Sequence, residues 1–328
     1  MLFVNSGAQP RRVLPADPHP DELAGHAVWI DLIDPTEEER AAVERASGLR
    51  VPSHAELAEI EQSSRLSAAG GVLTLSTPVV SRTDGVAPLV SPLGFVLSRE
   101  RLLTVRYAGL TAFDSFASSF GEAEGPGRSA VGAFIGLLEA IVDRLADILE
   151  RVGGELDEVS HRVFRTGDPG LPVVRRADAQ LQEQLRAIGR GGDLVSNLGD
   201  TLLGVGRIVA YASEMAADWT PAELKPRYAT LQRDIRSLQD YDAQLTNKVQ
   251  FLLDATLGFI NIQQNNGIKV LTVVSVVGVP PTLVASIYGM NFKNIPELNW
   301  AWGYEYGLAV IVLSALLPLL WFWRRGWI

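Results

Sequence analysis

The arrangement of apolar and polar residues changes near residue 127. Before that point, short apolar runs alternate with segments rich in Gly, Pro, Asp and Ser, a pattern typical of strands joined by turns. The runs predict strands at residues 28–32, 72–80, 94–98 and 102–107, and a short helix at residues 112–120. Interleaved strands and helices favour a sheet covered by helices, so we expect residues 1–127 to form an α/β domain.

Two helix starts in this part carry the sequence signature of a capping box. Thr36 is followed three residues later by Glu39, and Ser53 is followed in the same way by Glu56. In a capping box the hydroxyl accepts a hydrogen bond from the later N–H, and the carboxylate accepts one from the earlier N–H. We therefore expect one helix to begin after Thr36 and to run through Glu44, and another to begin after Ser53.

Beyond residue 127, apolar residues recur every three or four positions, as they do along one face of a helix. This spacing predicts a helix from about residue 128 that ends at the Gly-Asp-Pro-Gly segment 167–170. A second helix is predicted over about residues 173–216. Residues 128–220 should therefore form a helical bundle in the same cytoplasmic part of the protein.

A third helix is expected to begin at Pro221 and to form a stalk over residues 221–267. Neither Pro nor Gly occurs between Pro226 and Gly258, and the apolar spacing there is helical. If the helix continues to Gly289, its length is on the order of 100 Å. Such a length favours a stalk packed against copies of itself. The alternative is a long helix within a monomeric bundle.

The last part of the chain contains two apolar segments and almost no charge. Residues 268–290 and 304–323 each approach the ~20 apolar residues that a helix needs to cross a membrane. A loop at residues 291–303 would connect them, and residues 324–328 would form a basic tail. Trp and Tyr residues border the second segment at both ends, as expected at membrane interfaces. The sequence therefore predicts a membrane hairpin.

The orientation of this hairpin follows from three basic residues. Lys269 lies at the start of the first span, and Arg324 and Arg325 follow the second. Cytoplasmic flanks tend to carry Lys and Arg, so these residues should face the cytoplasm. The N-terminus has no basic region followed by a long apolar run, so we expect no cleaved signal peptide. Both termini are therefore expected in the cytoplasm, with the hairpin in the inner or plasma membrane.

The first span carries a stripe of residues at helical spacing. Its members, separated alternately by three and four positions, are Asn265, Ile268, Thr272, Ser275, Val279, Thr282 and Ser286. Most of them are polar but uncharged, which suits a helix lining a hydrated pore. Alternatively, small Ser and Thr residues allow close helix packing. Pro280 and Pro281 should bend the span and free backbone carbonyls. Both interpretations of the stripe require several copies of the chain.

Composition narrows the chemistry further. The net charge of −9 argues against a nucleic-acid partner. The chain has no Cys and four scattered His residues, so a zinc site built from thiolate or imidazole ligands is not expected. Any metal would have to be bound by oxygen atoms, which favours hard ions such as Mg²⁺. No phosphate-binding loop or nucleophile–base constellation appears, so neither an ATP-driven pump nor an enzyme is predicted.

Several short motifs lie around the end of the first span and along the second. They are Pro280-Pro281-Thr282-Leu283-Val284-Ala285-Ser286, Tyr288-Gly289-Met290-Asn291-Phe292, Pro296-Glu297-Leu298, Trp300, Gly303-Tyr304, Pro318 and 324–327. Together these motifs resemble the CorA family of divalent-cation channels. The match is strong over roughly the last 65 residues. Two departures are Ile295, where the family commonly has Met, and Phe292-Lys293-Asn294, where the zinc-associated sister branch has a Gly-rich loop.

The resemblance implies a homopentamer in the lipid bilayer that carries Mg²⁺, with Co²⁺ or Ni²⁺ as further cargo and no covalently bound cofactor. The ion entrance would be formed by Gly289, Met290, Asn291 and Glu297. Of these, the Gly289 backbone carbonyl and the Asn291 side-chain carbonyl would face the waters around the ion. Glu297 would concentrate cations, and Lys293 would partly offset its field.

The resemblance also implies positions along the pore and in the stalk. The positions that match the family's pore are Asn265, Ile268, Leu271, Val279 and Thr282. The polar stripe adds Thr272, Ser275 and Ser286 as further pore-lining positions. The Ile268 and Leu271 side chains would form an apolar constriction. Regulatory Mg²⁺ would bind carboxylates, and the candidates in the stalk are Asp234, Asp240, Asp242 and Asp254. In an oligomer, copies of Asp254 would also form a polar ring on the cytoplasmic side of the pore. Solvated charges on a helix surface are the simpler interpretation of these four.

Two other functions remain open. A zinc transporter of the sister branch, with or without proton coupling, would share the hairpin. A membrane-anchored sensor or scaffold would use the hairpin only as an anchor. Ion fluxes into liposomes separate the three hypotheses.

Overall fold

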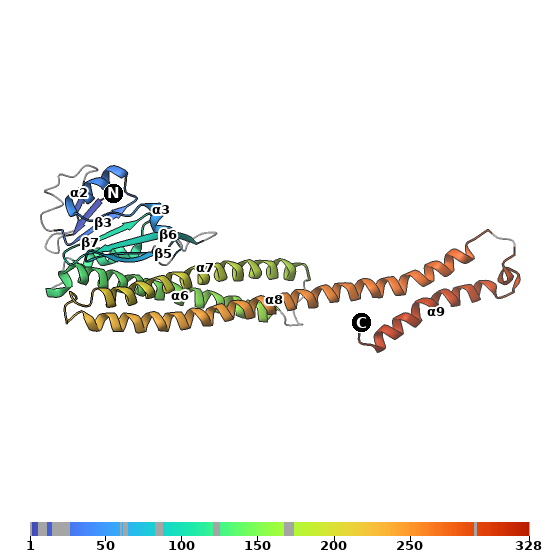
Figure 1. Cartoon of the computed structure of the whole chain (residues 1–328). Helices are drawn as coiled ribbons and strands as arrows, with labels where there is room; N and C mark the ends of the chain where they lie inside the picture. Colours follow the sequence, from blue (N-terminus) through green and yellow to red (C-terminus); the bar gives the residue numbers. More distant parts are fainter. Residues whose placement is uncertain are drawn as a thin grey trace. The chain divides into compact units, whose positions relative to one another are not determined.

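The structure, a computed structural model, describes residues 2–5, 12–14, 27–59, 61, 65–82, 88–120, 125–166, 174–291 and 294–327. The chain divides into two compact units, Met1–Leu253 and Asp254–Ile328 (Figure 1). The predicted helix end at residues 167–170 lies outside the described residues.

The first unit contains a mixed sheet. Within the described part of the chain its strands are β1 (Leu2–Asn5), β2 (Arg12–Leu14), β3 (Trp29–Ile33), β4 (Leu66–Ala69), β5 (Val72–Arg82), β6 (Leu89–Leu97) and β7 (Leu102–Arg106). Their order in the sheet is β2-β1-β3-β7-β6-β5-β4, with β3 and β7 parallel and the other neighbours antiparallel. Figure 1 shows the long helices α6 and α7 along one face of this sheet.

The expected strands and helices of this domain are present with shifted bounds. The helix α5 (Thr111–Phe120) matches the prediction closely, whereas β6 begins five residues before the expected start at Gly94. Pro92 in β6 lies opposite Pro78 in β5. Pro92 has no N–H for the sheet and is a signal against a strand, so the predicted strand begins only after it. The strands β1, β2 and β4 were not predicted.

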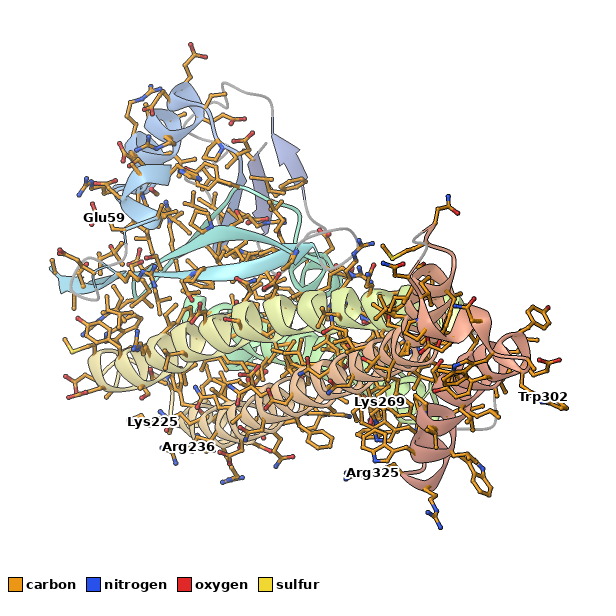
Figure 2. The ribbon with its side chains drawn as sticks, turned by 90° about the vertical axis from the view of Figure 1, so that its right-hand side faces the viewer. Glu59, Lys225, Arg236, Lys269, Trp302 and Arg325 are labelled. Atoms are coloured by element: carbon orange, nitrogen blue, oxygen red, sulfur yellow. The ribbon has the colours of Figure 1, made fainter. Side chains whose placement is uncertain are left out.

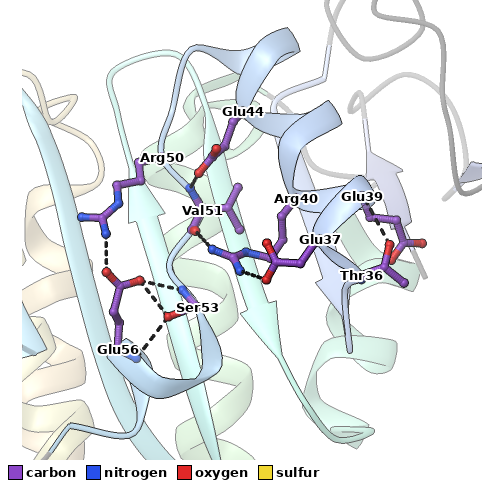
Figure 3. A network of polar contacts seen from close by, with 9 residues as sticks. All are labelled: Thr36, Glu37, Glu39, Arg40, Glu44, Arg50, Val51, Ser53 and Glu56. Carbon is purple, nitrogen blue, oxygen red and sulfur yellow. Dashed lines mark hydrogen bonds and ion pairs between the residues drawn. The ribbon is translucent and has the colours of Figure 1, made fainter.

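Both predicted capping boxes are formed, as Figure 3 shows. At the start of α2 (Glu37–Ser47), the Glu39 N–H donates to Thr36 Oγ1 at 3.2 Å and the Thr36 N–H donates to Glu39 Oε2 at 2.9 Å. At the start of α3 (His54–Leu57), the Ser53 N–H donates to Glu56 Oε2 at 2.8 Å. This backbone hydrogen bond is the main reason why the pKa of Glu56 is lowered. α2 continues three residues beyond the predicted end at Glu44.

An ion pair lies in the core of the sheet. Arg106 Nη2 contacts Asp31 Oδ2 at 2.8 Å, and both side chains are 1% exposed. The Thr104 hydroxyl donates to Asp31 Oδ1 at 2.7 Å and accepts from Trp29 Nε1 at 3.1 Å. The parallel pairing of β3 with β7 places Asp31 opposite Thr104, so strand register assembles this network.

Three long helices follow: α6 (Ala130–Thr166), α7 (Val174–Met215) and α8 (Lys225–Tyr288). α8 begins four residues later than predicted. Residues 221–224 form a turn in which the Leu224 N–H donates to Pro221 O at 3.0 Å. Pro226, not Pro221, is the proline in the first helical turn. N–H groups of the first turn have no partner within the helix, so the missing N–H of Pro226 costs no hydrogen bond.

Glycines on α7 allow α8 to approach closely. A Cβ on Gly192, Gly199 or Gly206 would lie 3.1, 2.7 or 3.3 Å from atoms of Val249, Asp242 or Ile235, respectively. Both sets have a spacing of seven residues and run in opposite directions, as in an antiparallel heptad contact. A carboxylate therefore occupies the central position of a seam whose other two positions are aliphatic.

The second unit contains the end of α8, the 3₁₀ helix η2 (Pro296–Asn299) and α9 (Gly303–Arg324). α8 and α9 each contain an apolar stretch long enough to cross a membrane. The most apolar stretch of α8 has no buried residue in the single chain. An apolar surface of this kind needs lipid or further protein to cover it.

Candidate functional site

The polar stripe of the first span lies on one uninterrupted helix. All of its members belong to α8, which continues through Pro280 and Pro281 to Tyr288. Ile268 and Val279 are each 61% exposed and Leu271 is 67% exposed, so this chain by itself does not cover the face. Spacings of three and four residues keep the stripe on one side of the helix.

Hydroxyl groups of the stripe donate back to the helix backbone. The Thr272, Thr282 and Ser286 hydroxyls donate to the carbonyls of Ile268, Gly278 and Thr282 at 2.8, 2.8 and 2.7 Å, respectively. Because the hydroxyl proton is engaged, the oxygen offers its remaining lone pairs as an acceptor. The stripe thus presents acceptor oxygens outward.

The two prolines add further acceptors. Pro280 and Pro281 have no N–H, so the carbonyls of Val276 and Val277, four residues earlier, receive no helical hydrogen bond from them. Such carbonyls need a partner, and water in a hydrated path would supply one.

The predicted entrance follows directly after the helix end. The Gly289 N–H donates to Ala285 O at 2.9 Å and the Met290 N–H donates to Ile287 O at 3.3 Å, which ends α8. Met290 is 48% exposed and Asn291 is also exposed. Glu297, on η2, is half-buried. Lys293 lies outside the described residues.

The loop is closed by a glycine whose role the sequence did not reveal. A Cβ on Gly303 would lie 2.2 Å from the Glu297 carbonyl oxygen, so the backbone of η2 rests on this glycine. The Gly303 N–H donates to Trp300 O at 3.2 Å. The only signal in the sequence is that Gly303 belongs to the motifs that carry the family resemblance.

The carboxylates selected in the stalk do not come together in one chain. The charge of Asp234 contributes to the raised pKa of Asp143 in α6. Asp242 instead lies against Gly199 of α7, close to Asp200. Asp240 and Asp254 are exposed on α8. Within the described ranges, no group of three or more His, Cys, Asp or Glu side chains is arranged to hold a metal ion.

Comparison with known proteins places these features in a family. The family model described as "CorA-like Mg2+ transporter protein" matches residues 24–325. The chain belongs to the CorA family. The match includes the α/β domain from residue 24 onward, the three long helices and the hairpin, so the resemblance noted at the end of the first span extends to most of the chain. CorA proteins are transporters, and this chain is accordingly a membrane transport protein and not an enzyme.

Individual CorA relatives cover nearly the whole chain. The magnesium transport protein CorA of Haemophilus ducreyi is 32% identical over 309 residues, which are 94% of this chain and 94% of the relative. That of Escherichia coli K12 is 32% identical over 303 residues, 92% of each chain.

Solved structures agree with the fold. CorA from Methanocaldococcus jannaschii has a TM-score of 0.74 at 20% identity and covers 100% of this chain and 99% of its own. The full-length CmaX protein has a TM-score of 0.67 at 18% identity, covering 99% and 96%. The predicted architecture is thereby confirmed: an N-terminal α/β domain, long helices and two C-terminal apolar helices.

Proposed function

We propose that this CorA-family chain forms a homopentameric channel through which hydrated Mg²⁺, and also Co²⁺ or Ni²⁺, passes down its electrochemical gradient. The observation that carries the proposal is the acceptor stripe of α8, which leads to Asn291 and is left uncovered by its own chain. One hairpin cannot surround an ion path, so several copies must contribute α8. The 32% identity to magnesium transport proteins supports Mg²⁺ as the ion.

The chemistry of the stripe suits an ion that keeps its water shell. Mg²⁺ loses water reluctantly, and its bound waters point their hydrogens outward. Oxygens that only accept hydrogen bonds, such as those of Thr272, Thr282 and Ser286, match these waters along the path. At the entrance the Asn291 amide and the Gly289 carbonyl would act in the same way, and Glu297 would raise the local cation concentration.

The inner end of the span differs in character. Ile268 and Leu271 are apolar, and a ring of such side chains opposes hydration when it is narrow. Asn265 and Asp254 follow on the stalk side as polar positions. We propose that the apolar ring closes the channel and that α8, which carries both the ring and the stalk, opens it.

Mg²⁺ entry needs no chemical energy source in this proposal. With the Asn291 end outside and the termini in the cytoplasm, an inward-negative potential favours entry of a divalent ion by about 4.6 kcal/mol per 100 mV. This orientation places Lys269 and the two terminal arginines in the cytoplasm.

Regulation by cytoplasmic Mg²⁺ would involve Asp234, Asp240, Asp242 and Asp254. These carboxylates are spread along α8, and Mg²⁺ prefers about six oxygen ligands. A regulatory ion there would therefore take ligands from a second copy of the chain or keep most of its waters.

Ion flux into proteoliposomes under an applied potential tests the proposal. We expect the purified protein to admit Mg²⁺ faster than Zn²⁺, without a pH gradient. Faster Zn²⁺ flux, or flux that requires a proton gradient, would favour a zinc transporter. No divalent-cation flux at all would favour a sensor or scaffold.

A further inference from the structure

The C-terminal end of α9 is folded back on itself by a glycine. Gly326 has a φ of +67°, a left-handed conformation that other residues adopt at a cost. Its N–H donates to Trp323 O at 3.1 Å, and the Trp327 N–H donates to Phe322 O at 3.1 Å. These are the two hydrogen bonds of a Schellman motif, which also brings the flanking apolar residues together.

This turn builds an aromatic platform. The centre of the Phe322 ring lies 5.3 Å from that of the Trp327 ring and 5.0 Å from that of the Trp321 ring. Phe322 is only 2% exposed as a result, although it lies at the end of an otherwise exposed helix. The platform is therefore packed within a single chain.

Two cations from different helices lie on this platform. Lys269 Nζ of α8 is 5.9 Å from the centre of the Trp327 ring, and the Arg325 guanidinium after α9 is 5.1 Å from that of Trp321. Both cations are labelled in Figure 2. Attraction of a cation to the ring face holds each charge in place without neutralising it. Arg324 precedes Arg325 directly and adds a third charge at this end of the hairpin.

These charges lack acidic partners among the described residues. In the first unit, Arg227 pairs with Glu139 and Lys248 pairs with Asp157. By contrast, no ion pair in the described ranges involves Lys269, Arg324 or Arg325. Three positive charges beside a Trp-rich helix end therefore face outward without an anion.

We propose that Lys269 and Arg325, held by the Trp321–Phe322–Trp327 platform, bind the phosphate headgroup of an anionic phospholipid together with the adjacent Arg324. The inference rests on the hairpin crossing a membrane, as proposed above. A lipid fits better than a soluble phosphate because Lys269 lies at the start of the apolar stretch of α8 and the two arginines lie at the end of α9, so bound acyl chains would lie along these apolar stretches. Tryptophan favours the headgroup level, which places the cations at the depth of the lipid phosphates.

Competition between lipids tests this site in the full-length protein. Quenching of tryptophan fluorescence by brominated phosphatidylglycerol and brominated phosphatidylcholine in mixed micelles measures the preference for the anionic lipid. We expect Lys269→Gln combined with Arg325→Gln to reduce the preference about fivefold for each cation removed. Arg236→Gln, which removes an exposed charge of the stalk (Figure 2), should leave the preference unchanged.

Gly326→Ala provides a second variant that keeps every charge. A Cβ at this position meets no atom within 4 Å, so the substitution acts through backbone strain and should displace Trp327. We expect it to weaken the preference as well, because the cations lose their platform. An unchanged preference would contradict a built site and leave only diffuse charge attraction.

Three further outcomes would overturn the proposal: no preference in the unmodified protein, a full preference in the double variant, or displacement of the lipid by glycerol phosphate at equal concentration. None depends on transport. A protein that binds the lipid but conducts no cation would refute only the channel.

Discussion

At the scale of single residues, Asp242 is a strained charge in the first unit, Met1–Leu253. It lies at the central position of the α7–α8 seam, against Gly199 and beside Asp200. Burial, and secondarily repulsion from Asp200, raises the pKa of Asp242 from 3.8 to about 6. Its Oδ1 atom is buried without a hydrogen-bond partner among the described residues. The folded state therefore binds a proton that the unfolded chain releases between these two values.

The raised pKa of Asp242 makes the stability of the folded protein depend on pH. Because the pKa is raised on folding, the stabilising effect of protonation is complete below pH 3.8 and is lost as pH rises through about 6. We expect Asp242→Asn to raise the stability at pH 7.5 by about 1–2 kcal/mol, since the half-exposed side chain is partly screened, and much less at pH 4.5. Thermal unfolding in detergent at both pH values measures this.

Asp240→Asn is the matched control, because Asp240 is exposed on the same helix. It should change the unfolding temperature little at either pH. A destabilised Asp242→Asn variant at pH 7.5, or the same shift at both pH values, would show that the Asp242 charge is not strained.

At the scale of elements, α8 joins two kinds of helix face. Its first part packs against α7 through the heptad glycine contacts, and its last part carries the hydroxyl stripe. The stripe was predictable because three-and-four spacing needs only the sequence. The meeting of Gly199 with Asp242 was not, because it depends on the antiparallel register of two helices.

In other elements, too, local features could be predicted from the sequence, whereas features that depend on distant contacts could not. The helices that follow Thr36 and Ser53 could be predicted because a capping box involves only residues three positions apart, and both boxes are formed. Strand β4 escaped prediction because its four residues, Leu66–Ala69, are mostly exposed and show no alternation. The Schellman turn at Gly326 had a local signal, a glycine just after an apolar helix, but the contact of Trp327 with Lys269 needs the folded hairpin.

Thr282→Val tests the role of the stripe. The substitution keeps the shape of the side chain but removes the acceptor oxygen, so hydrated Mg²⁺ loses one hydrogen bond from each subunit at that level of the path. We expect the flux of Mg²⁺ into liposomes to fall about tenfold. Ser314→Ala is the control, since the Ser314 hydroxyl on α9 makes the same kind of backbone bond, to Ile311 O at 2.7 Å, away from the stripe. Equal losses in both variants would contradict a specific role for α8.

At the scale of the whole molecule, one helix of 64 residues belongs to both compact units, beginning in the first unit and ending directly before the loop that carries Asn291. The family match covers both units, which supports a single transport protein over an enzyme with an incidental anchor. The uncovered stripe of one chain becomes interpretable when several chains surround a path. In the proposed channel the path begins at Asn291, so the proposed function depends most on this residue.

The most direct measurement is therefore Mg²⁺ flux through Asn291→Ala in proteoliposomes under an inside-negative potential. Asn294→Ala, which removes an exposed amide from the same loop, serves as the control. We expect Asn291→Ala to abolish flux while the particle size in detergent remains that of the unmodified protein, and Asn294→Ala to conduct normally. Unchanged flux through Asn291→Ala, or an unmodified protein that is monomeric in detergent, would contradict the proposed channel.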